Sequence, residues 1–450
     1  MKTKQNSVDM LNGSLAGKIF LFALPLALTQ ILQQLFNSAD LAVVGRFASA
    51  EAMAAVGSNA SVINLIVSLF TGLSVGANVL IATLIGKGEQ NKINEAVHTI
   101  ITVSLLCGIV LIFFGIWSAP GLLKMMDAPK NVMDLALIYL RIYFLGMPFL
   151  MVYDFGSAIL RSKGDSARPL YCLIVSGIVN IILNLFFVIV CKIGVVGVSI
   201  ATVIANAICA VMVIRFLAKE KGAFHFSFHN ISIHTEYLKS IIKIGLPAGV
   251  QGMVFSISNV VIQSGINSFG ADAIAGASAA QNFEFMAYYV VNAFAQAAVT
   301  FTSQNFGARK FDRCKKVYKI SFWFSALITL LFSTIFWMGK DFFLSFFSTD
   351  PKVIQYAVTR MMWVSNLVLL SGTYEISGGC LRGMGKSMLP AVLTLIGSCL
   401  FRLVYICFIF AKCHTFDVLF AVYPVTWIIT GIAVTFSYYH IRKQLFQEEK

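Results

Sequence analysis

The sequence predicts an all-α integral membrane protein with twelve transmembrane helices in two six-helix lobes. Three observations support this prediction. The 450-residue chain is 58% hydrophobic and only 12% charged, with a mean hydropathy of +0.81, which leaves too little polar surface for a soluble protein of this size. It contains twelve apolar runs of the length that crosses a bilayer, about 20 residues each. Its second half also repeats its first.

The twelve apolar runs follow one another with short polar gaps. They lie near residues 19–44, 53–84, 96–118, 132–160, 169–191, 194–216, 240–268, 276–304, 317–338, 353–381, 388–411 and 418–440. The gaps at Pro169 and Gly194 are short, so each is either a turn or a kink. Pro25 and Pro247 recur near the start of each half, where proline bends a helix and frees a backbone carbonyl. Each bend is either a packing kink or a hinge.

The repeat is clearest between residues 153–169 and 374–390. Tyr, Leu, Arg, Gly, Ser and Pro recur 221 residues apart without a gap, and Asp154 is matched by Glu375. Each half holds an even number of spans, so both halves enter the membrane from the same side. We therefore expect a pseudo-two-fold axis along the membrane normal. The expected domains are an N-terminal lobe, a cytoplasmic linker and a C-terminal lobe, at 1–218, 219–239 and 240–450.

The formal charge of +14 is distributed as in a membrane protein. With the N-terminus inside, the cytoplasmic segments hold 24 of the 34 Lys and Arg and the outer segments hold 7. This is the positive-inside bias, and it places both termini in the cytoplasm. The basic segments are then expected to meet anionic lipid of the bilayer rather than nucleic acid.

Four acids lie inside the predicted spans: Asp40, Asp154, Glu284 and Glu375. An ionisable side chain in hydrocarbon is costly, so each is a candidate for function. Such a carboxyl group can exchange H⁺ or Na⁺ as its access to water changes, which a cation-coupled transporter requires. The sequence contains no Walker loop, zinc-site spacing or nucleophile elbow. We therefore expect neither ATP hydrolysis nor enzymatic activity.

Asp40 has no acidic counterpart in the second half, where Ile262 takes its place. Asn180 and Asn184 lie one helical turn apart in the fifth run, and Thr202 lies in the sixth. Together with Asp40 they offer a hard cation a shell of oxygen ligands. Each Asn or Thr taken alone is explained as well by hydrogen bonding between helices. We predict that the four residues form a cation-coupling site, which is a metal site if the ion is Na⁺.

Asp154 and Glu375 are possible coupling or substrate-binding residues. Each lies seven residues before an arginine, Arg161 or Arg382, and so about 10 Å deeper than the cytoplasmic boundary. The alternative is an arrangement of charges along one helix that eases burial.

Glu284 is the third such candidate, in a polar and aromatic patch at 281–289. The patch suits an apolar or cationic guest, or else helix packing. Arg402 in the eleventh run needs a carboxylate, and Glu375 is its nearest candidate.

Several motifs carry a family resemblance. They are Leu160-Arg161-Ser-Lys-Gly164-Asp165-Ser166-Ala-Arg-Pro169, Asn180-Ile-Ile-Leu-Asn184, Gly194-Val-Val-Gly197-Val-Ser-Ile-Ala201-Thr202 and Gln304-Asn305-Phe306-Gly307-Ala308. With them the chain resembles a prokaryotic branch of the multidrug and toxic compound extrusion (MATE) transporters over essentially its full length. The resemblance implies export of drug-like, cationic or amphipathic compounds against an inward flow of H⁺ or Na⁺, by alternating access and without a cofactor. It also implies a bacterial plasma membrane, and we expect a functional monomer.

The resemblance also maps a cation site of the N-terminal lobe onto Asp40, Asn180, Asn184 and Thr202. Several members have Asp where this chain has Asn184, so one carboxylate of that version of the site is missing. Asp154 is a candidate replacement, although nothing in the sequence places it near Asn184. In the C-terminal lobe the resemblance points, more weakly, to Glu284 and Glu375.

A flippase for lipid-linked saccharides or lipids of the same superfamily is the alternative function. Such proteins tend to have extra spans and a strongly basic cavity, whereas the buried charges here are four acids against three arginines.

Overall fold

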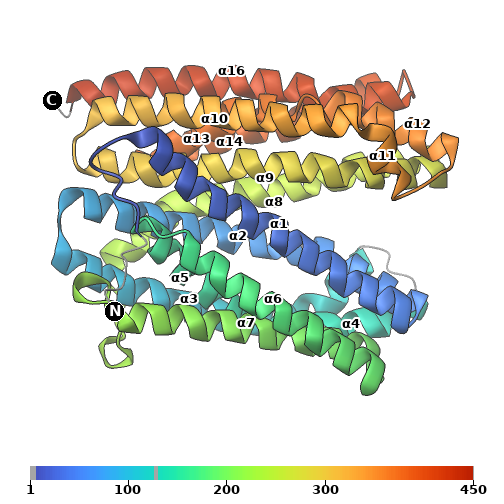
Figure 1. The fold of residues 1–450 in the computed structure, drawn as a ribbon, viewed down its shortest axis with the longest axis horizontal. Coiled ribbons are helices and arrows are strands. Elements are labelled where there is room, and N and C mark those ends of the chain that lie inside the picture. Colours follow the sequence, from blue (N-terminus) through green and yellow to red (C-terminus); the bar gives the residue numbers. More distant parts are fainter. Residues whose placement is uncertain (1–6, 126–129, 449–450) are drawn as a thin grey trace. The chain divides into compact units, whose positions relative to one another are not determined.

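The computed structural model describes residues 7–125 and 130–448 and is built from helices (Figure 1). No β-strand occurs within these two ranges. In lipid every backbone N–H and C=O group must be satisfied inside its own segment, so an apolar run of this length forms a helix. The prediction of an all-α fold is confirmed.

Six spans come from the first half of the chain. They are α1 (Leu15–Phe47), α2 (Ala50–Lys87), α3 (Gln90–Met125), the pair α4 (Lys130–Leu145) and α5 (Met147–Ser162), α6 (Ala167–Leu185) continued by η1 (Phe186–Val190), and α7 (Gly194–Lys219). Helices α4 and α5 form one broken span that bends by 48° at Gly146. Two short 3₁₀ helices follow, η2 (Gly222–Phe224) and η3 (Phe228–Asn230).

Six further spans come from the second half. They are α8 (Thr235–Asn267), α9 (Ala271–Gly307), α10 (Phe311–Met338), α12 (Pro351–Arg360) continued through η4 (Met361–Ser365) and η5 (Val368–Leu370) into α13 (Ser371–Gly383), α14 (Met388–Thr394) continued through η6 (Leu395–Leu400) and α15 (Phe401–Tyr405) into η7 (Ile406–Phe410), and α16 (Phe416–Glu448). The short α11 (Lys340–Ser345) follows α10.

Helix α9 is the span that hydropathy alone does not identify. Ten helices are long and apolar enough to cross a membrane, and the bent pair α4 and α5 makes eleven. Helix α9 is 37 residues long, but it is rich in alanine and carries Gln281, Asn282 and Glu284, which lower its hydropathy. Most of its residues are buried against other helices. With α9 the spans in the described ranges number twelve, and each predicted run lies over one of them.

Both of the doubtful gaps are turns. Gly164 and Gly194 have φ angles of +97° and +47°, in the left-handed region that glycine adopts without strain. After the first turn, Asp165 Oδ1 accepts hydrogen bonds from the backbone N–H groups of Ala167 and Arg168 at 3.1 and 3.0 Å and so caps the start of α6. The repeated motif therefore ends one helix and starts the next.

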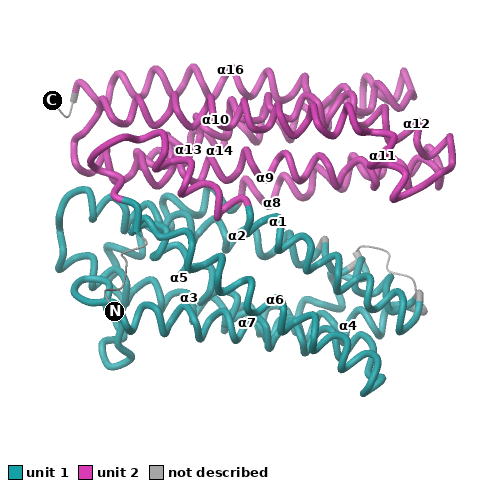
Figure 2. The backbone as a smooth tube through the Cα atoms, in the orientation of Figure 1, with its two compact units in different colours: residues 1–8, 28–249 teal, residues 9–27, 250–450 magenta. Residues whose placement is uncertain are grey.

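The structure divides into two compact units, coloured separately in Figure 2. Of the described residues, one unit contains 7–8 and 28–249, and the other contains 9–27 and 250–448. The divisions lie within α1 and α8, a few residues after Pro25 and Pro247. The linker and the start of α8 belong to the first unit.

Helix α3 holds the linker in the first unit. Asn94 Nδ2 donates to the carbonyl oxygens of Ala223 and His225 at 3.2 and 3.0 Å, and the backbone N–H of Ser227 donates to His98 Nε2 at 3.1 Å. Phe226 is fully buried beside them. The linker is thus a packed part of this unit.

Glu220, at the C-terminal end of α7, ties the linker to the turn after α5. Its carboxylate accepts from Lys163 Nζ at 2.5 Å and pairs with Arg168 NH1 at 2.6 Å. Burial raises the pKa of Glu220, but these two cations lower it by more, so the net shift is downward. The basic motif is therefore partly neutralised.

Two glycines let α13 pack closely against α9 in the second unit. A Cβ atom at Gly379 would lie 2.8 Å from the carbonyl oxygen of Ala295, and one at Gly383 would lie 2.8 Å from that of Val299. Small residues four apart are typical of close helix contacts in membranes. Because Glu375 lies one turn before Gly379, this contact also fixes its carboxylate against α9.

We predict that Gly379→Ala destabilises the protein by about 1–3 kcal/mol, because the new methyl group meets backbone that cannot move aside. The matched control is Gly121→Ala in α3, where a Cβ meets no atom within 4 Å. The measurement is the apparent melting temperature of each purified variant in detergent. Equal melting temperatures for Gly379→Ala and Gly121→Ala would show that the contact is looser than described.

Candidate functional site

The four residues predicted to couple a cation lie together in the first unit. Asn184 Nδ2 donates to Asp40 Oδ1 at 2.5 Å and to Asn180 Oδ1 at 3.2 Å. The hydroxyl of Thr202 lies 3.5 Å from Asp40 Oδ2. Asp40, Asn180 and Asn184 are all buried. Helices α1, α6 and α7 thus contribute to one cluster of oxygen and amide groups.

Local packing explains why α1 meets α6 at this point. Gly177 lies one turn before Asn180, and its missing side chain leaves room for the ring of Phe36. Phe36 in turn lies one helical turn before Asp40 on α1. The contact therefore holds the carboxylate-bearing turn of α1 next to the amide-bearing turn of α6.

One acceptor in the cluster is unused. Asn184 Oδ1 is buried and has no hydrogen-bond partner among the described residues. A buried amide oxygen without a partner is costly, by about 1–3 kcal/mol. A rotation of the amide by half a turn would direct this oxygen toward Asp40, where a cation would satisfy it.

The ligand set of this cluster is one carboxylate, two amides and one hydroxyl. Oxygen ligands of this kind suit a hard cation such as Na⁺. In the described part of the chain no group of three or more His, Cys, Asp and Glu is placed to hold a metal ion. The chemistry that fits the cluster is therefore binding of a proton or of one hard monovalent ion.

Asp154 lies apart from this cluster. Its carboxylate hydrogen-bonds Thr71 of α2 and interacts electrostatically with Arg161 on its own helix. Tyr143 of α4 lies within electrostatic range of both Asp154 and Asp40. Among the described residues no hydrogen bond joins Asp154 to Asn184, and Tyr143 lies within electrostatic range of both acids.

Glu284 is held by an arginine that the sequence did not assign to it. In the second unit, Arg360 of α12 donates to Glu284 Oε2 from Nε at 3.1 Å and from NH2 at 2.8 Å. The two side chains are only 3% and 10% exposed. The polar patch on α9 thus contains a buried ion pair. The sequence shows that Arg360 lies within a span, but it does not show which acid this arginine contacts.

Glu375 is not the partner of Arg402. Its carboxylate accepts a hydrogen bond from the hydroxyl of Tyr288 at 3.1 Å. Arg402 donates instead to Asn259 Oδ1 at 3.5 Å and stacks on Tyr423. The expected pairing was wrong because α13 and α15 direct these two side chains toward different helices.

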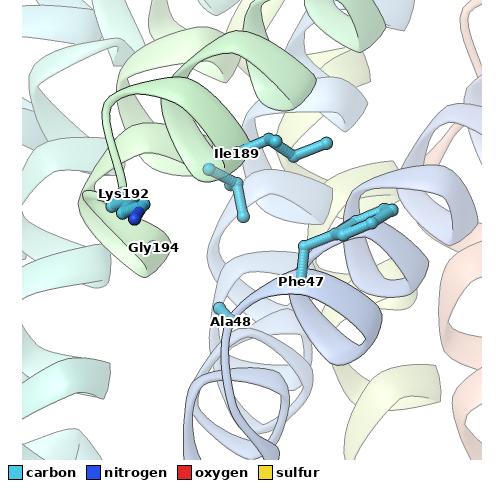
Figure 3. Close-up of a pocket in the computed structure, with 6 residues that line it drawn as sticks. Phe47, Ala48, Ile189, Lys192 and Gly194 are labelled. Atoms are coloured by element: carbon cyan, nitrogen blue, oxygen red, sulfur yellow. The ribbon is translucent and has the colours of Figure 1, made fainter.

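A cavity of about 340 Å³ lies in the first unit at the ends of α1 and η1 (Figure 3). It is lined by Phe47, Ala48, Val188, Ile189, Lys192 and Gly194. None of the residues predicted for cation or substrate binding lines it. Its apolar walls carry one cation, Lys192.

Comparison with known proteins places both halves of the chain in one family. The family model MatE matches residues 25–186 and again residues 247–408. A probable multidrug resistance protein of Bacillus subtilis, YoeA, is 28% identical over 382 residues, which is 83% of this chain and 82% of the relative. A probable multidrug resistance protein of Thermotoga maritima, NorM, is 23% identical over 382 residues, which is 83% of this chain and 81% of the relative.

A solved structure shows the same fold. It is that of a MOP superfamily transporter from Pyrococcus furiosus, with a TM-score of 0.89 at 21% identity, and the match covers 99% of each chain. The helical order described above is therefore that of a known transporter fold.

We predict that Arg360→Met lowers the stability by about 3–5 kcal/mol, because it leaves the carboxylate of Glu284 buried without a partner. Replacing both residues, as Glu284→Gln with Arg360→Met, should restore most of this loss. The apparent melting temperatures of the two single variants and the double variant measure the coupling. Additive effects would mean that the two side chains do not stabilise one another.

Proposed function

The chain belongs to the MatE family of transporters, and from that premise we propose that it is a cation-coupled antiporter for drug-like compounds. It exports cationic or amphipathic molecules by alternating access of two lobes, in exchange for H⁺ or Na⁺. Family membership makes it a transporter and not an enzyme. We also propose that it acts without a cofactor, as a monomer in a bacterial plasma membrane with both termini in the cytoplasm.

The observation that carries this proposal is the cluster around Asp40. A lone buried carboxylate is costly in hydrocarbon, and among the described residues the hydrogen bonds to Asp40 come from an amide and a hydroxyl. Neither of these neutralises its charge. The carboxylate is therefore ready to take a proton or a monovalent cation.

Cation binding and the present hydrogen bonds exclude one another. Asn184 now directs its NH₂ group to both Asp40 and Asn180. A cation on Asp40 would repel that NH₂ group and attract the unpartnered Oδ1 of the same side chain. Loading of the site thus changes the contacts between α1 and α6. Two arrangements of these helices with different affinity for the ion are what coupling requires.

The position of the cluster on α1 supports a role in the transport cycle. Helix α1 contributes residues 15–27 to the second unit and residues 28–47 to the first, and Pro25 lies close to this division. A proline inside a helix removes a hydrogen bond and allows bending. We propose that the contacts of Asp40 bias this bend, so that ion binding favours one arrangement and substrate binding the other.

Flippase activity toward lipid-linked saccharides remains the alternative function. Within residues 7–125 and 130–448 the spans number twelve, whereas such proteins tend to have more. Export of soluble amphipathic compounds is therefore the function that we favour.

The test is efflux of a fluorescent cationic dye from proteoliposomes, driven in one experiment by a proton gradient and in another by a sodium gradient. We predict that Asp40→Asn folds normally and loses at least about 90% of gradient-driven efflux, because the amide cannot take up a cation. Asp341→Asn is the matched control, since its side chain is 83% exposed on α11. Efflux at the wild-type rate from Asp40→Asn proteoliposomes would refute the proposal.

A further inference from the structure

Arg402 is a buried cation of the second unit without an anionic partner. It is 2% exposed. Its single hydrogen bond among the described residues is a long one, from NH1 to Asn259 Oδ1 at 3.5 Å, and its Nε has no acceptor in that part of the chain. The guanidinium lies 4.4 Å from the ring centroid of Tyr423 and 6.0 Å from that of Phe255.

The aromatic contacts do not balance the cost of burying this charge. A guanidinium stays protonated in proteins, so it cannot escape the cost by losing its proton. Removing such a charge from water costs several kcal/mol, whereas a cation–π contact returns about 2 kcal/mol. The remaining donors of Arg402 thus require an acceptor, and a negatively charged one compensates best.

Glu284, the acid near Arg402, already forms an ion pair with Arg360. Tyr423 lies within electrostatic range of Arg402 and also of Glu284 and Arg360. Because Arg360 neutralises Glu284, these three charged side chains sum to one positive charge. Tyr374 of α13 is a further neighbour of Arg402 and is a neutral phenol. No described element around Arg402 supplies a free carboxylate to it.

The repeat shows which spans of the first half correspond to the spans around Arg402. The two segments matched by the family model begin 222 residues apart, at residues 25 and 247. At that spacing Asn259 corresponds to Asn37, and Arg402, like Asn180, lies in the fifth span of its half. Ile262 takes the place of Asp40 and is buried. The same three spans of each half, the first, fifth and sixth, therefore build a cluster with a fixed anion in one unit and a fixed cation in the other.

We propose that Arg402, with Asn259 and Tyr423, binds the carboxylate of an amphipathic aromatic substrate. The planar guanidinium can donate two parallel hydrogen bonds to a carboxylate, while Tyr423 and Phe255 offer aromatic faces to the body of the guest. This inference rests on the proposed export function and narrows its substrate class. Amphipathic substrates then include zwitterions, whose carboxylate binds in the second unit.

A matched pair of dyes tests the proposal. Rhodamine B and its ethyl ester share the same cationic ring system and differ in a free carboxylate. Binding of each to the purified full-length protein in detergent is measured by fluorescence anisotropy at neutral pH. The wild type should bind rhodamine B about tenfold more tightly than the ester, as expected for hydrogen bonds to a charged group. No preference for the free acid in the wild type would overturn the proposal.

Variants test whether Arg402 produces the preference for the free acid over the ester. Arg402→Gln should weaken rhodamine B binding about tenfold and leave the ester unchanged or slightly tighter, whereas Arg402→Lys should keep an intermediate preference. Arg442→Gln is the matched control, because Arg442 also lies over aromatic rings, at 5.3 Å from Tyr438 and 4.7 Å from Tyr439. Equal weakening of both dyes by Arg402→Gln would assign Arg402 a packing role and contradict the proposal.

Competition on the wild type gives an answer that does not depend on any variant folding. Sodium benzoate should displace rhodamine B at concentrations at least about tenfold lower than sodium sulfate, because the rings favour an aromatic carboxylate. Equal displacement by the two salts would mean that only charge is recognised and would overturn the assigned class. Asp40→Asn should keep the preference for the free acid, so failure of antiport and failure of this site are separable.

Discussion

A charge buried in hydrocarbon must be compensated, and the arrangement of this protein's polar side chains follows from that constraint. Three of the four acids within the spans have different kinds of partner. Glu284 forms an ion pair with Arg360, and Glu375 accepts from a tyrosine hydroxyl. In the part of the chain that the structure describes, Asp40 is hydrogen-bonded by an amide and a hydroxyl. A neutralised pair such as Glu284 and Arg360 has little reason to bind an ion, whereas Asp40 is the acid that we propose to bind one.

The fold repeats while its chemistry does not. Both halves use six spans with closely similar helix ends, since Gly164 and Gly385 each adopt a positive φ in the repeated motif. The acid of the first span is nevertheless found only once, at Asp40, with Ile262 in its place in the second half. The two halves thus share the same helix ends, where the backbone needs a conformation that glycine adopts without strain. The halves differ at Asp40 and Ile262, which lie inside the first span of each half.

The sequence predicts the helices well because hydropathy and helix-end residues act locally. All twelve runs lie over spans, including alanine-rich α9, which an average over hydropathy misses. The grouping of Asp40 with Asn184 followed from shared faces and from the family resemblance. The pairing of Glu284 with Arg360 could not be predicted in this way, and neither could the separation of Arg402 from Glu375. Both depend on how neighbouring helices are rotated. The division of α1 between the units depends likewise on packing across the chain.

An amide rather than an acid at Asn184 determines the charge balance of the candidate cation site. With Asp40 as its one carboxylate, the cluster becomes neutral when it holds a proton or a single monovalent ion. A second carboxylate would leave it negative after loading, at a further cost of burial in low dielectric. Asp154 does not restore that charge, because Thr71 and Arg161 occupy its surroundings. The same neutral end state is reached with H⁺ and with Na⁺, so the discrimination between them must come from oxygen geometry, in which the unpartnered Oδ1 of Asn184 is the variable element.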